Sequence, residues 1–180
     1  MNRGDINDDI RRIKGLIRDI PDFPQRGVIF RDITTLLREG RWFKRAVDLL
    51  YQECRGLKFD RIVAVEARGF AIAAPLAYKL KKGLILVRKP GKLPYKTRRV
   101  TYQLEYGSDA LEMHQDEIQP GFKILLVDDV LATGGTCRAV IDLVSGQGGE
   151  VVSCLFLIEL TFLKGREKLA PCPVFSLIQY

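Results

Sequence analysis

The sequence has little histidine and little cysteine, and both scarcities exclude classes of enzyme. His114 is the single histidine, which excludes zinc sites built from several histidines and proteases with two histidines on one helix. The four cysteines lie at least 17 residues apart, so there is no Cys-x-x-Cys pair for zinc binding or thiol–disulfide chemistry. We expect reduced thiols, most of them simply buried.

Long apolar runs are also missing. The longest, residues 70–78, has nine residues and contains Pro75, whereas a membrane span needs about 18. Residues 1–12 are too charged to form the apolar part of a signal peptide. Hydrophobic residues make up 47% and charged residues 28% of a chain of 180 residues. We therefore expect one folded domain over residues 1–180, in the cytoplasm and without a membrane partner.

Positive charge is concentrated in one segment. Between Glu66 and Glu105 the chain has ten basic residues and no acidic one, which leaves 19 of its 29 basic residues against all 22 acidic ones elsewhere. A basic stretch in an otherwise mildly acidic protein favours one polyanionic ligand. A solvated basic loop and a nucleic-acid site are the alternatives. Tyr95 and Tyr102 are too few aromatic residues for a base-stacking surface, so we expect no nucleic-acid partner.

Apolar patterning predicts strands that alternate with helices. The predicted helices cover residues 5–20, 41–54 and 69–80, with a fourth that ends near residue 144. The predicted strands cover residues 61–65, 84–87, 100–106, 111–114, 124–127, 151–158 and 174–178. Residues 88–99 contain two prolines and no periodicity, which predicts a loop. Because the strands are apolar throughout, the expected fold class is α/β, with a parallel sheet core flanked by helices.

The segment 124–136 combines an apolar strand, two carboxylates and a glycine-rich loop. The strand delivers Asp128 and Asp129 to its carboxyl end, where ligands bind in open α/β sheets. The loop then offers backbone N–H groups and hydroxyls to a phosphate at the start of a helix. Its residues are Ala132, Thr133, Gly134, Gly135 and Thr136. Carboxylates beside a phosphate suit sugar hydroxyls or a metal, so the segment predicts a ribose phosphate site. An ordinary strand–turn–helix with an aspartate cap is the alternative.

This segment resembles the phosphoribosyl pyrophosphate motif of the type I phosphoribosyltransferases. In that family the paired acids hold the ribose hydroxyls, and the loop holds the phosphate at the far end of the sugar. Other segments, from about residue 16 to the end, resemble the adenine phosphoribosyltransferase branch; they are residues 21–24, 27–33, 67–70, 88–94, 104–107 and 163–169. The resemblance implies purine salvage, in which phosphoribosyl passes from phosphoribosyl pyrophosphate to adenine to give AMP and pyrophosphate. It also implies the type I fold, with a small N-terminal hood from residues 1–35 and a flexible loop.

Residue roles follow from the same resemblance. The catalytic residues it implies are Glu105, Asp128, Asp129 and Arg68. The further binding residues it implies are Arg88 and Lys89, which join Arg68 at pyrophosphate, and Ile29, Phe30 and Arg31 at adenine. Four residues in the resembling segments also have a purely structural interpretation. Phe30 could be an ordinary core residue, and Arg68 could pair with Glu66. Glu105 could be an exposed acid on a strand, and Asp32 could cap a helix or turn before Thr34. The chain departs from many relatives in having Ala67 where they have serine.

The resemblance also implies Mg²⁺ and a homodimer. The metal would bridge pyrophosphate and sugar oxygens, without direct protein ligands. Residues 88–106 are expected to form a mobile lid, because they carry many like charges and no apolar periodicity. The rival hypothesis is a non-catalytic regulator that senses phosphoribosyl pyrophosphate. Such regulators usually carry a DNA-binding module, for which about 20 residues before Pro21 leave too little room.

Overall fold

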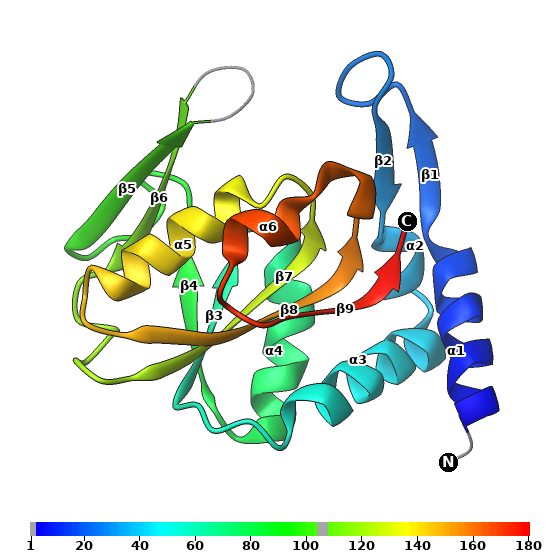
Figure 1. Ribbon diagram of the computed structural model, residues 1–180, viewed down its shortest axis with the longest axis horizontal. Coiled ribbons are helices and arrows are strands. Elements are labelled where there is room, and N and C mark those ends of the chain that lie inside the picture. Colours follow the sequence, from blue (N-terminus) through cyan, green and yellow to red (C-terminus); the bar gives the residue numbers. More distant parts are fainter. Residues whose placement is uncertain (1–2, 104–107) are drawn as a thin grey trace. The chain divides into compact units, whose positions relative to one another are not determined.

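The computed structural model describes residues 3–103 and 108–180 (Figure 1). The chain divides into two compact units, Met1–Leu49 and Leu50–Tyr180, which are described separately. The expectation of one domain with a hood from residues 1–35 stays a prediction. No helix in the described part of the chain is long and apolar enough to cross a membrane.

The unit Met1–Leu49 is built from helices and one short hairpin. Its elements are α1 (Arg3–Leu16), β1 (Arg18–Pro21), β2 (Ile29–Asp32), α2 (Thr34–Leu37) and the first part of α3 (Gly40–Cys54). The helix predicted to reach Ile20 ends at Leu16, because the next residues pair with β2 in an antiparallel ladder. The Gly27 N–H donates to Asp22 Oδ1 at 2.7 Å and holds the connecting turn. Helix α3 confirms the helix predicted over residues 41–54.

An ion pair joins the two strands of this hairpin. Nη2 and Nε of Arg18 lie 2.6 and 3.1 Å from Asp32 Oδ2. The other oxygen of Asp32 accepts the Thr34 N–H at 2.9 Å, which agrees with the alternative in which Asp32 caps a turn before Thr34. Hydrogen bonds from Arg18 first, and then from Thr34, lower the pKa of Asp32 from 3.8 to about 2.

The unit Leu50–Tyr180 contains the predicted parallel sheet. The strands of this sheet are β3 (Arg61–Val65), β4 (Gly83–Val87), β7 (Lys123–Leu131), β8 (Glu150–Glu159) and β9 (Val174–Gln179). They lie in the order β4-β3-β7-β8-β9 and all pair in parallel, which confirms the α/β fold class. The other elements of this unit are α4 (Arg68–Leu80), β5 (Thr97–Gln103), β6 (Ser108–His114), α5 (Gly135–Ser145), a 3₁₀ turn (Thr161–Leu163) and α6 (Gly165–Leu169).

Alternating side chains bury both faces of the sheet. Val63 of β3 and Leu126 of β7 pack in one core cluster with residues of α5, including Val140. Their chain neighbours Ile62 and Leu125 are equally buried and point to the opposite face, which α4 covers (Figure 1). A strand with two buried faces reads as a continuous apolar run, which is why the sequence predicts these strands well.

Several boundaries in this unit differ from the predictions. Strand β7 continues to Leu131, so the two aspartates lie inside the strand, where Asp128 pairs with Phe156 of β8. Strand β5 begins at Thr97, because it pairs with β6 from Thr97↔His114 onward, so the predicted loop ends at residue 96. Pro75 lies in the interior of α4, beyond its first turn. Strand β5 contains residues 100–103 of the strand predicted over residues 100–106, and Val100 pairs with Leu111 of β6.

The strand order fixes where a ligand can bind. Strands β3 and β7 are neighbours, but their connections leave toward opposite sides of the sheet, which makes them the topological switch point. Loops diverge there and leave a crevice at the carboxyl ends of the strands. Residues 66–68 follow β3, and the glycine-rich loop 132–136 follows β7. The predicted phosphate motif therefore lies at this crevice.

Limited proteolysis tests the corrected loop boundary. Within residues 88–106 we expect trypsin to cut first after Lys92 or Lys96, which are exposed and lie outside the strands. Arg98 and Arg99 pair with β6 and should be cut later, because a protease needs locally unfolded chain. Mass spectrometry of the early fragments identifies the sites, and a Lys92→Gln/Lys96→Gln double variant is the control. Early cuts after Arg98 or Arg99 would contradict the strand assignment.

The pH dependence of unfolding tests the Arg18–Asp32 pair. The pKa of Asp32 is lowered on folding, so its stabilisation is complete above about pH 4 and is lost as the pH falls toward 2. Asp32→Asn should therefore lower the free energy of unfolding at pH 7 by on the order of 1 kcal/mol, since Arg18 is half exposed and solvent screens the pair. Urea unfolding should show this difference shrinking between pH 4 and pH 2. Asp116→Asn, an exposed control, should leave the stability unchanged.

Candidate active site

The unit Leu50–Tyr180 brings several of the predicted site residues together. Asp128 and residues 130–137 line a cavity of about 80 Å³ at the carboxyl end of β7. The cavity contains the whole loop 132–136 and the start of α5, whose first N–H groups have no partner within the helix. Small size, backbone donors and a helix start suit one phosphate group.

A buried pair of carboxylates lies beside this loop. Asp128 and Asp129 are consecutive, and the Asp129 N–H donates to Asp128 Oδ1 at 2.9 Å. Arg68, at the start of α4, places its Nε 2.6 Å from Asp129 Oδ2. The predicted residues Arg68, Asp128 and Asp129 therefore form one cluster at the switch point.

Burial leaves this carboxylate pair poorly solvated. Burial first, and then the charge of Asp129, raise the pKa of Asp128 well above its ordinary value. Burial also raises the pKa of Asp129, although the charge of Arg68 opposes it. Two adjacent buried carboxyl groups do not readily ionise together, because their negative charges repel each other. A ligand that brings hydroxyl donors, a cation or developing positive charge would stabilise both ionised forms.

Gly69 permits the close approach of α4 to this pair. A Cβ atom at Gly69 would lie 2.6 Å from Asp128 Oδ1 and 3.3 Å from its Cα. The first turn of α4 thus packs directly against the strand that carries the carboxylates. Any larger side chain would push Asp128 away from its position.

The phosphate loop rests on a second glycine segment. Gly134 has a φ of 78° and caps α5, and a Cβ there would overlap the carbonyl oxygen of Gly165. A Cβ at Gly165 would in turn overlap the carbonyl oxygen of Ala132. The turn before α6 therefore supports the loop through backbone contacts alone. This contact explains why the sequence motif 163–169 accompanies the phosphate motif.

Basic residues after β4 have acidic partners within the protein. Arg88 donates to Glu66 Oε2 at 2.8 Å, and Lys92 donates to Glu66 Oε1 at 3.1 Å. Burial alone would raise the pKa of Glu66, but these two bonds outweigh it, and the pKa lies below its ordinary value. Glu66, which the sequence suggested as a partner of Arg68, is joined to Ala67 by a cis peptide bond.

A chain of polar contacts links Lys89 to the phosphate loop. Lys89 forms an ion pair with Asp109 of β6. The Tyr102 hydroxyl donates to Asp109 Oδ2 at 3.2 Å and lies 3.3 Å from Thr136 Oγ1. Burial raises the pKa of Tyr102, so its hydroxyl keeps its proton. The sequence did not identify Asp109, because its contacts depend on the pairing of β5 with β6.

The residues predicted to contact adenine belong to the other unit. Ile29, Phe30 and Arg31 lie on β2, where Phe30 packs edge-on against Phe23 at 5.1 Å and Arg31 pairs with Asp19. Phe30 is only partly buried, unlike a core residue. Their position relative to the carboxylates stays a prediction. Glu105, predicted as the catalytic-loop glutamate, lies outside the described residues.

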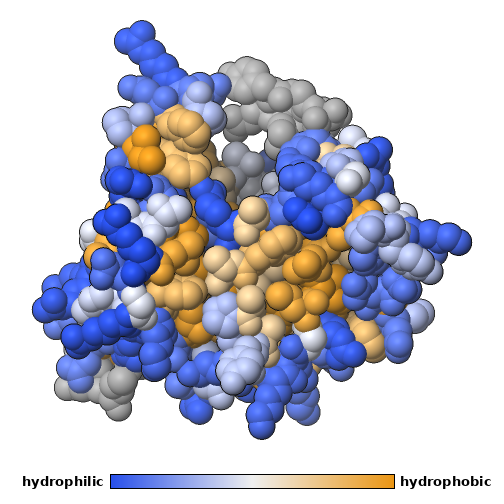
Figure 2. Space-filling model, turned by 180° about the vertical axis from the view of Figure 1, so that it is seen from behind, coloured by the Kyte–Doolittle hydropathy of each residue, from blue (hydrophilic) through white to orange (hydrophobic). Residues whose placement is uncertain are grey.

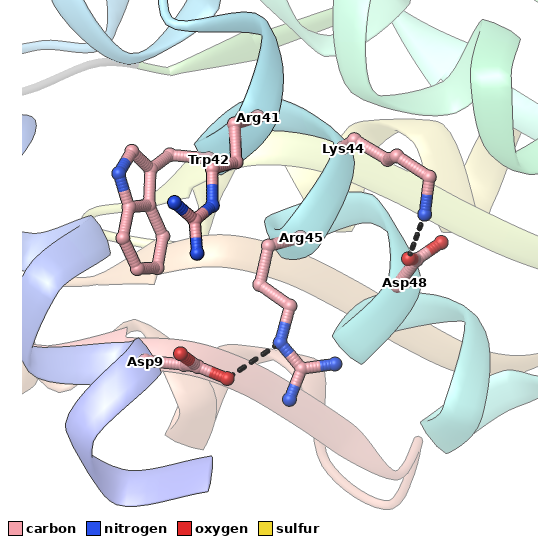
Figure 3. Close-up of a pocket in the computed structure, with 6 residues that line it drawn as sticks. All are labelled: Asp9, Arg41, Trp42, Lys44, Arg45 and Asp48. Carbon is pink, nitrogen blue, oxygen red and sulfur yellow. Dashed lines mark hydrogen bonds and ion pairs between the residues drawn. The ribbon is translucent and has the colours of Figure 1, made fainter. Parts of the chain in front are cut away.

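A larger pocket in the unit Met1–Leu49 does not compete as the active site. It has a volume of about 300 Å³ and lies between α1 and α3 (Figure 3). Its charged groups already pair with each other, as Arg45 Nε with Asp9 at 2.6 Å and Lys44 with Asp48 at 2.7 Å. Arg41 lies over the ring of Trp42. The chemistry-bearing cluster therefore remains the one at the carboxyl ends of β3 and β7.

Comparison with known proteins agrees with this geometry. The phosphoribosyl transferase domain family matches residues 32–172. The adenine phosphoribosyltransferase of Geobacter metallireducens is 58% identical over 168 residues, which cover 93% of this chain and 98% of that protein. The enzyme of the same name from Fervidobacterium nodosum is 56% identical over 168 residues. The match covers 93% of this chain and 99% of that protein.

Solved structures show the same relationship. Adenine phosphoribosyltransferase from Thermoanaerobacter pseudethanolicus superposes with a TM-score of 0.93 at 50% identity, over 95% of this chain and 99% of its own. The Saccharomyces cerevisiae enzyme, complexed with an imino-altritol bisphosphate and adenine, superposes with a TM-score of 0.88 at 36% identity. The match covers 95% of this chain and 99% of the yeast chain. The chain therefore belongs to the phosphoribosyltransferase family. Within that family it belongs to the adenine phosphoribosyltransferases.

Substitution of Gly69 tests the packing of α4 against the carboxylates. Gly69→Ala should lower turnover by about 10²-fold, because the new methyl group displaces Asp128. A displacement of about 1 Å in a catalytic group can lower the rate by this factor. Gly83→Ala is the matched control, since a Cβ there meets only the flexible side chain of Arg61. Steady-state kinetics and circular dichroism of both variants make the comparison. Equal activity of the two folded variants would contradict the role of Gly69.

Proposed function

We propose that the site at the carboxyl ends of β3 and β7 transfers phosphoribosyl from phosphoribosyl pyrophosphate to adenine, which yields AMP and pyrophosphate for purine salvage. The observation that carries this proposal is the buried pair Asp128–Asp129 beside the loop 132–136. A phosphate cradle next to two carboxylates matches a sugar phosphate and no simpler anion. The identity of the base follows from the family branch to which the chain belongs.

The loop 132–136 holds the 5-phosphate in this proposal. Backbone N–H groups at the start of α5 and the hydroxyls of Thr133 and Thr136 are its donors. Gly165 packs against the backbone of Ala132 and Gly134, so the N–H and hydroxyl donors of the loop are positioned before the ligand binds. A preorganised cradle loses little conformational entropy on binding.

Asp128 and Asp129 accept hydrogen bonds from the ribose hydroxyls. Departure of pyrophosphate from the anomeric carbon generates an oxocarbenium-like transition state with positive charge on the sugar. The buried carboxylates stabilise that charge more strongly than they stabilise the neutral sugar, because the surrounding protein is poorly polarisable. Arg68 orients Asp129 through their ion pair, and its guanidinium charge attracts the pyrophosphate.

The donor set at the site fits magnesium held mainly by substrate and water. Within residues 3–103 and 108–180 no group of three or more histidine, cysteine or acidic side chains is arranged to hold a metal ion. Mg²⁺ in phosphate sites usually keeps several waters and takes one or two carboxylates plus substrate oxygens. Asp128 and Asp129 would hold it through water. When bound, the ion neutralises charge on the pyrophosphate leaving group.

Adenine recognition and proton transfer belong to residues 29–31 and to Glu105 in this proposal. Phe30 offers an aromatic face to the purine, and residues 1–35 form the hood over the base. Glu105 accepts or orients the ring proton that adenine loses as its nitrogen attacks the sugar. Arg88 and Lys89 bind pyrophosphate once their present partners, Glu66 and Asp109, release them.

We also propose a homodimer that acts in the cytoplasm on small molecules, with no nucleic-acid or membrane partner. Within the unit Leu50–Tyr180, Tyr78 on α4 is 89% exposed, and Leu86 on the edge strand β4 is 38% exposed. Figure 2 shows apolar residues at the surface among polar ones. These side chains would offer apolar contacts to a second copy.

A turnover assay tests the proposed reaction directly. The chain should convert adenine and phosphoribosyl pyrophosphate to AMP and pyrophosphate with Mg²⁺ present, and the reaction should stop in excess EDTA. EDTA already saturated with Mg²⁺ is the control for nonspecific effects. Product formation followed by chromatography makes the measurement. Full activity in excess EDTA would overturn the metal requirement, and no AMP formation would overturn the function.

Substitution of Asp129 tests its electrostatic role. Asp129→Asn should lower turnover by about 10²–10³-fold, the usual effect of removing one preorganised electrostatic partner. Asp142→Asn, which alters an exposed aspartate on α5, is the control and should keep normal turnover. Both variants should fold, as thermal unfolding can verify. Near-normal turnover of the folded Asp129→Asn variant would place the ribose contact elsewhere.

A further inference from the structure

Two cysteines outside the active site lie against each other. All four cysteines are free thiols, and the Sγ atoms of Cys154 and Cys172 are 3.5 Å apart. Cys154 lies on β8 and is completely buried. Cys172 lies in the turn between α6 and β9 and is partly exposed. Closing the gap to a bond needs only a small approach of the two sulfur atoms.

Small oxidants have access to one member of this pair. Cys172 lines a surface cavity of about 350 Å³, together with Arg138, Pro171 and Pro173. Cys154 is fully shielded from solvent and does not line that cavity. An oxidant that enters the cavity therefore meets Cys172 first.

The surroundings of the pair favour a thiolate on Cys172. The hydrogen bond from Cys154 first, and then the positive charge of Arg138, lower the pKa of Cys172, although burial opposes them. The contact with Cys172 first, and then burial, raise the pKa of Cys154, which keeps its proton at neutral pH. The accessible sulfur is thus the more readily ionised of the two.

We propose that Cys172 and Cys154 form a peroxide-responsive pair, in which Cys172 is oxidised and Cys154 resolves it to a disulfide. The Cys172 thiolate attacks one peroxide oxygen, the O–O bond breaks, and the sulfur becomes a sulfenic acid as the first water forms. Cys154 then attacks that sulfur, the S–S bond forms, and the sulfenic oxygen leaves as a second water. Two thiols lose two electrons and two protons, and one peroxide is reduced to two waters.

The disulfide would enclose the segment that supports the phosphate loop. The two cysteines are 18 positions apart, and the chain between them contains the 3₁₀ turn and α6. Gly165, at the start of α6, contacts the backbone of Ala132 and Gly134. Oxidation would therefore link the segment that carries Gly165 covalently to β8. The new bond would also restrict the conformations of the unfolded chain.

The other two cysteines, Cys137 and Cys54, are buried and have raised pKa values, so oxidation should be selective for the Cys154–Cys172 pair. Cys137 is buried beside the carboxylates, and burial raises its pKa well above the ordinary value. Burial likewise raises the pKa of Cys54 to about 11. Both thiols are protonated and shielded, so peroxide should leave them unchanged.

Peroxide treatment of the purified full-length protein tests the proposal. We expect two of the four thiols to be lost, a decrease of two hydrogen atoms in the intact mass, and a peptide in which Cys154 is linked to Cys172. Dithiothreitol should restore both thiols. The melting temperature should be higher in the oxidised protein than in the reduced one, and Cys172→Ser should abolish both the linkage and this rise.

Variants of Cys154 separate the two steps. In Cys154→Ala, dimedone should trap a sulfenic acid on Cys172, because no resolving thiol remains; Cys154→Ser provides a second variant if the first folds poorly. Cys54→Ser is the matched control and should form the disulfide normally. A linkage that includes Cys137, a dimer joined through Cys172, or four unchanged thiols after peroxide treatment of the natural chain would each overturn the proposal.

Discussion

The burial of two consecutive carboxylates at the end of a central strand is the constraint on which the site depends. Asp128 and Asp129 continue β7 beyond its apolar part, and they lie in the sheet with little access to water. Such groups are costly to bury unless they have partners. Arg68 is the charged partner of Asp129, and the Asp129 backbone N–H is a hydrogen-bond partner of Asp128. Gly69 lets the first turn of α4, which carries Arg68, approach the pair closely.

The sequence predicts the elements whose patterns are local. The sheet strands are apolar throughout, and the phosphate motif is contiguous, so both could be found from residue order alone. The hairpin β1–β2 could not, because each strand has only four residues of mixed exposure and owes its shape to the partner strand. The full length of β7 was also missed, since two aspartates interrupt the apolar pattern of a strand that nevertheless continues to Leu131.

The site shows the same division between local and tertiary information. Asp128, Asp129 and loop 132–136 lie together as predicted, because they are neighbours in the chain. The importance of Gly165 and Asp109 depends on contacts across 20 or more positions, namely with the phosphate loop and with Lys89. No spacing rule identifies such contacts. The Cys154–Cys172 pair is similar, since sequence spacing alone argued against any paired thiols.

The internal ion pairs after β4 have a consequence for how products leave. Arg88 and Lys89 rest against Glu66 and Asp109, so a pyrophosphate group that binds them exchanges one set of charge contacts for another. The exchange lowers the net affinity, because the broken contacts offset part of the new ones. In the proposed reaction, the same carboxylates would compete with the departing anion for their cations once transfer is complete. Such competition would keep a highly charged product from remaining bound, which would let the site turn over repeatedly.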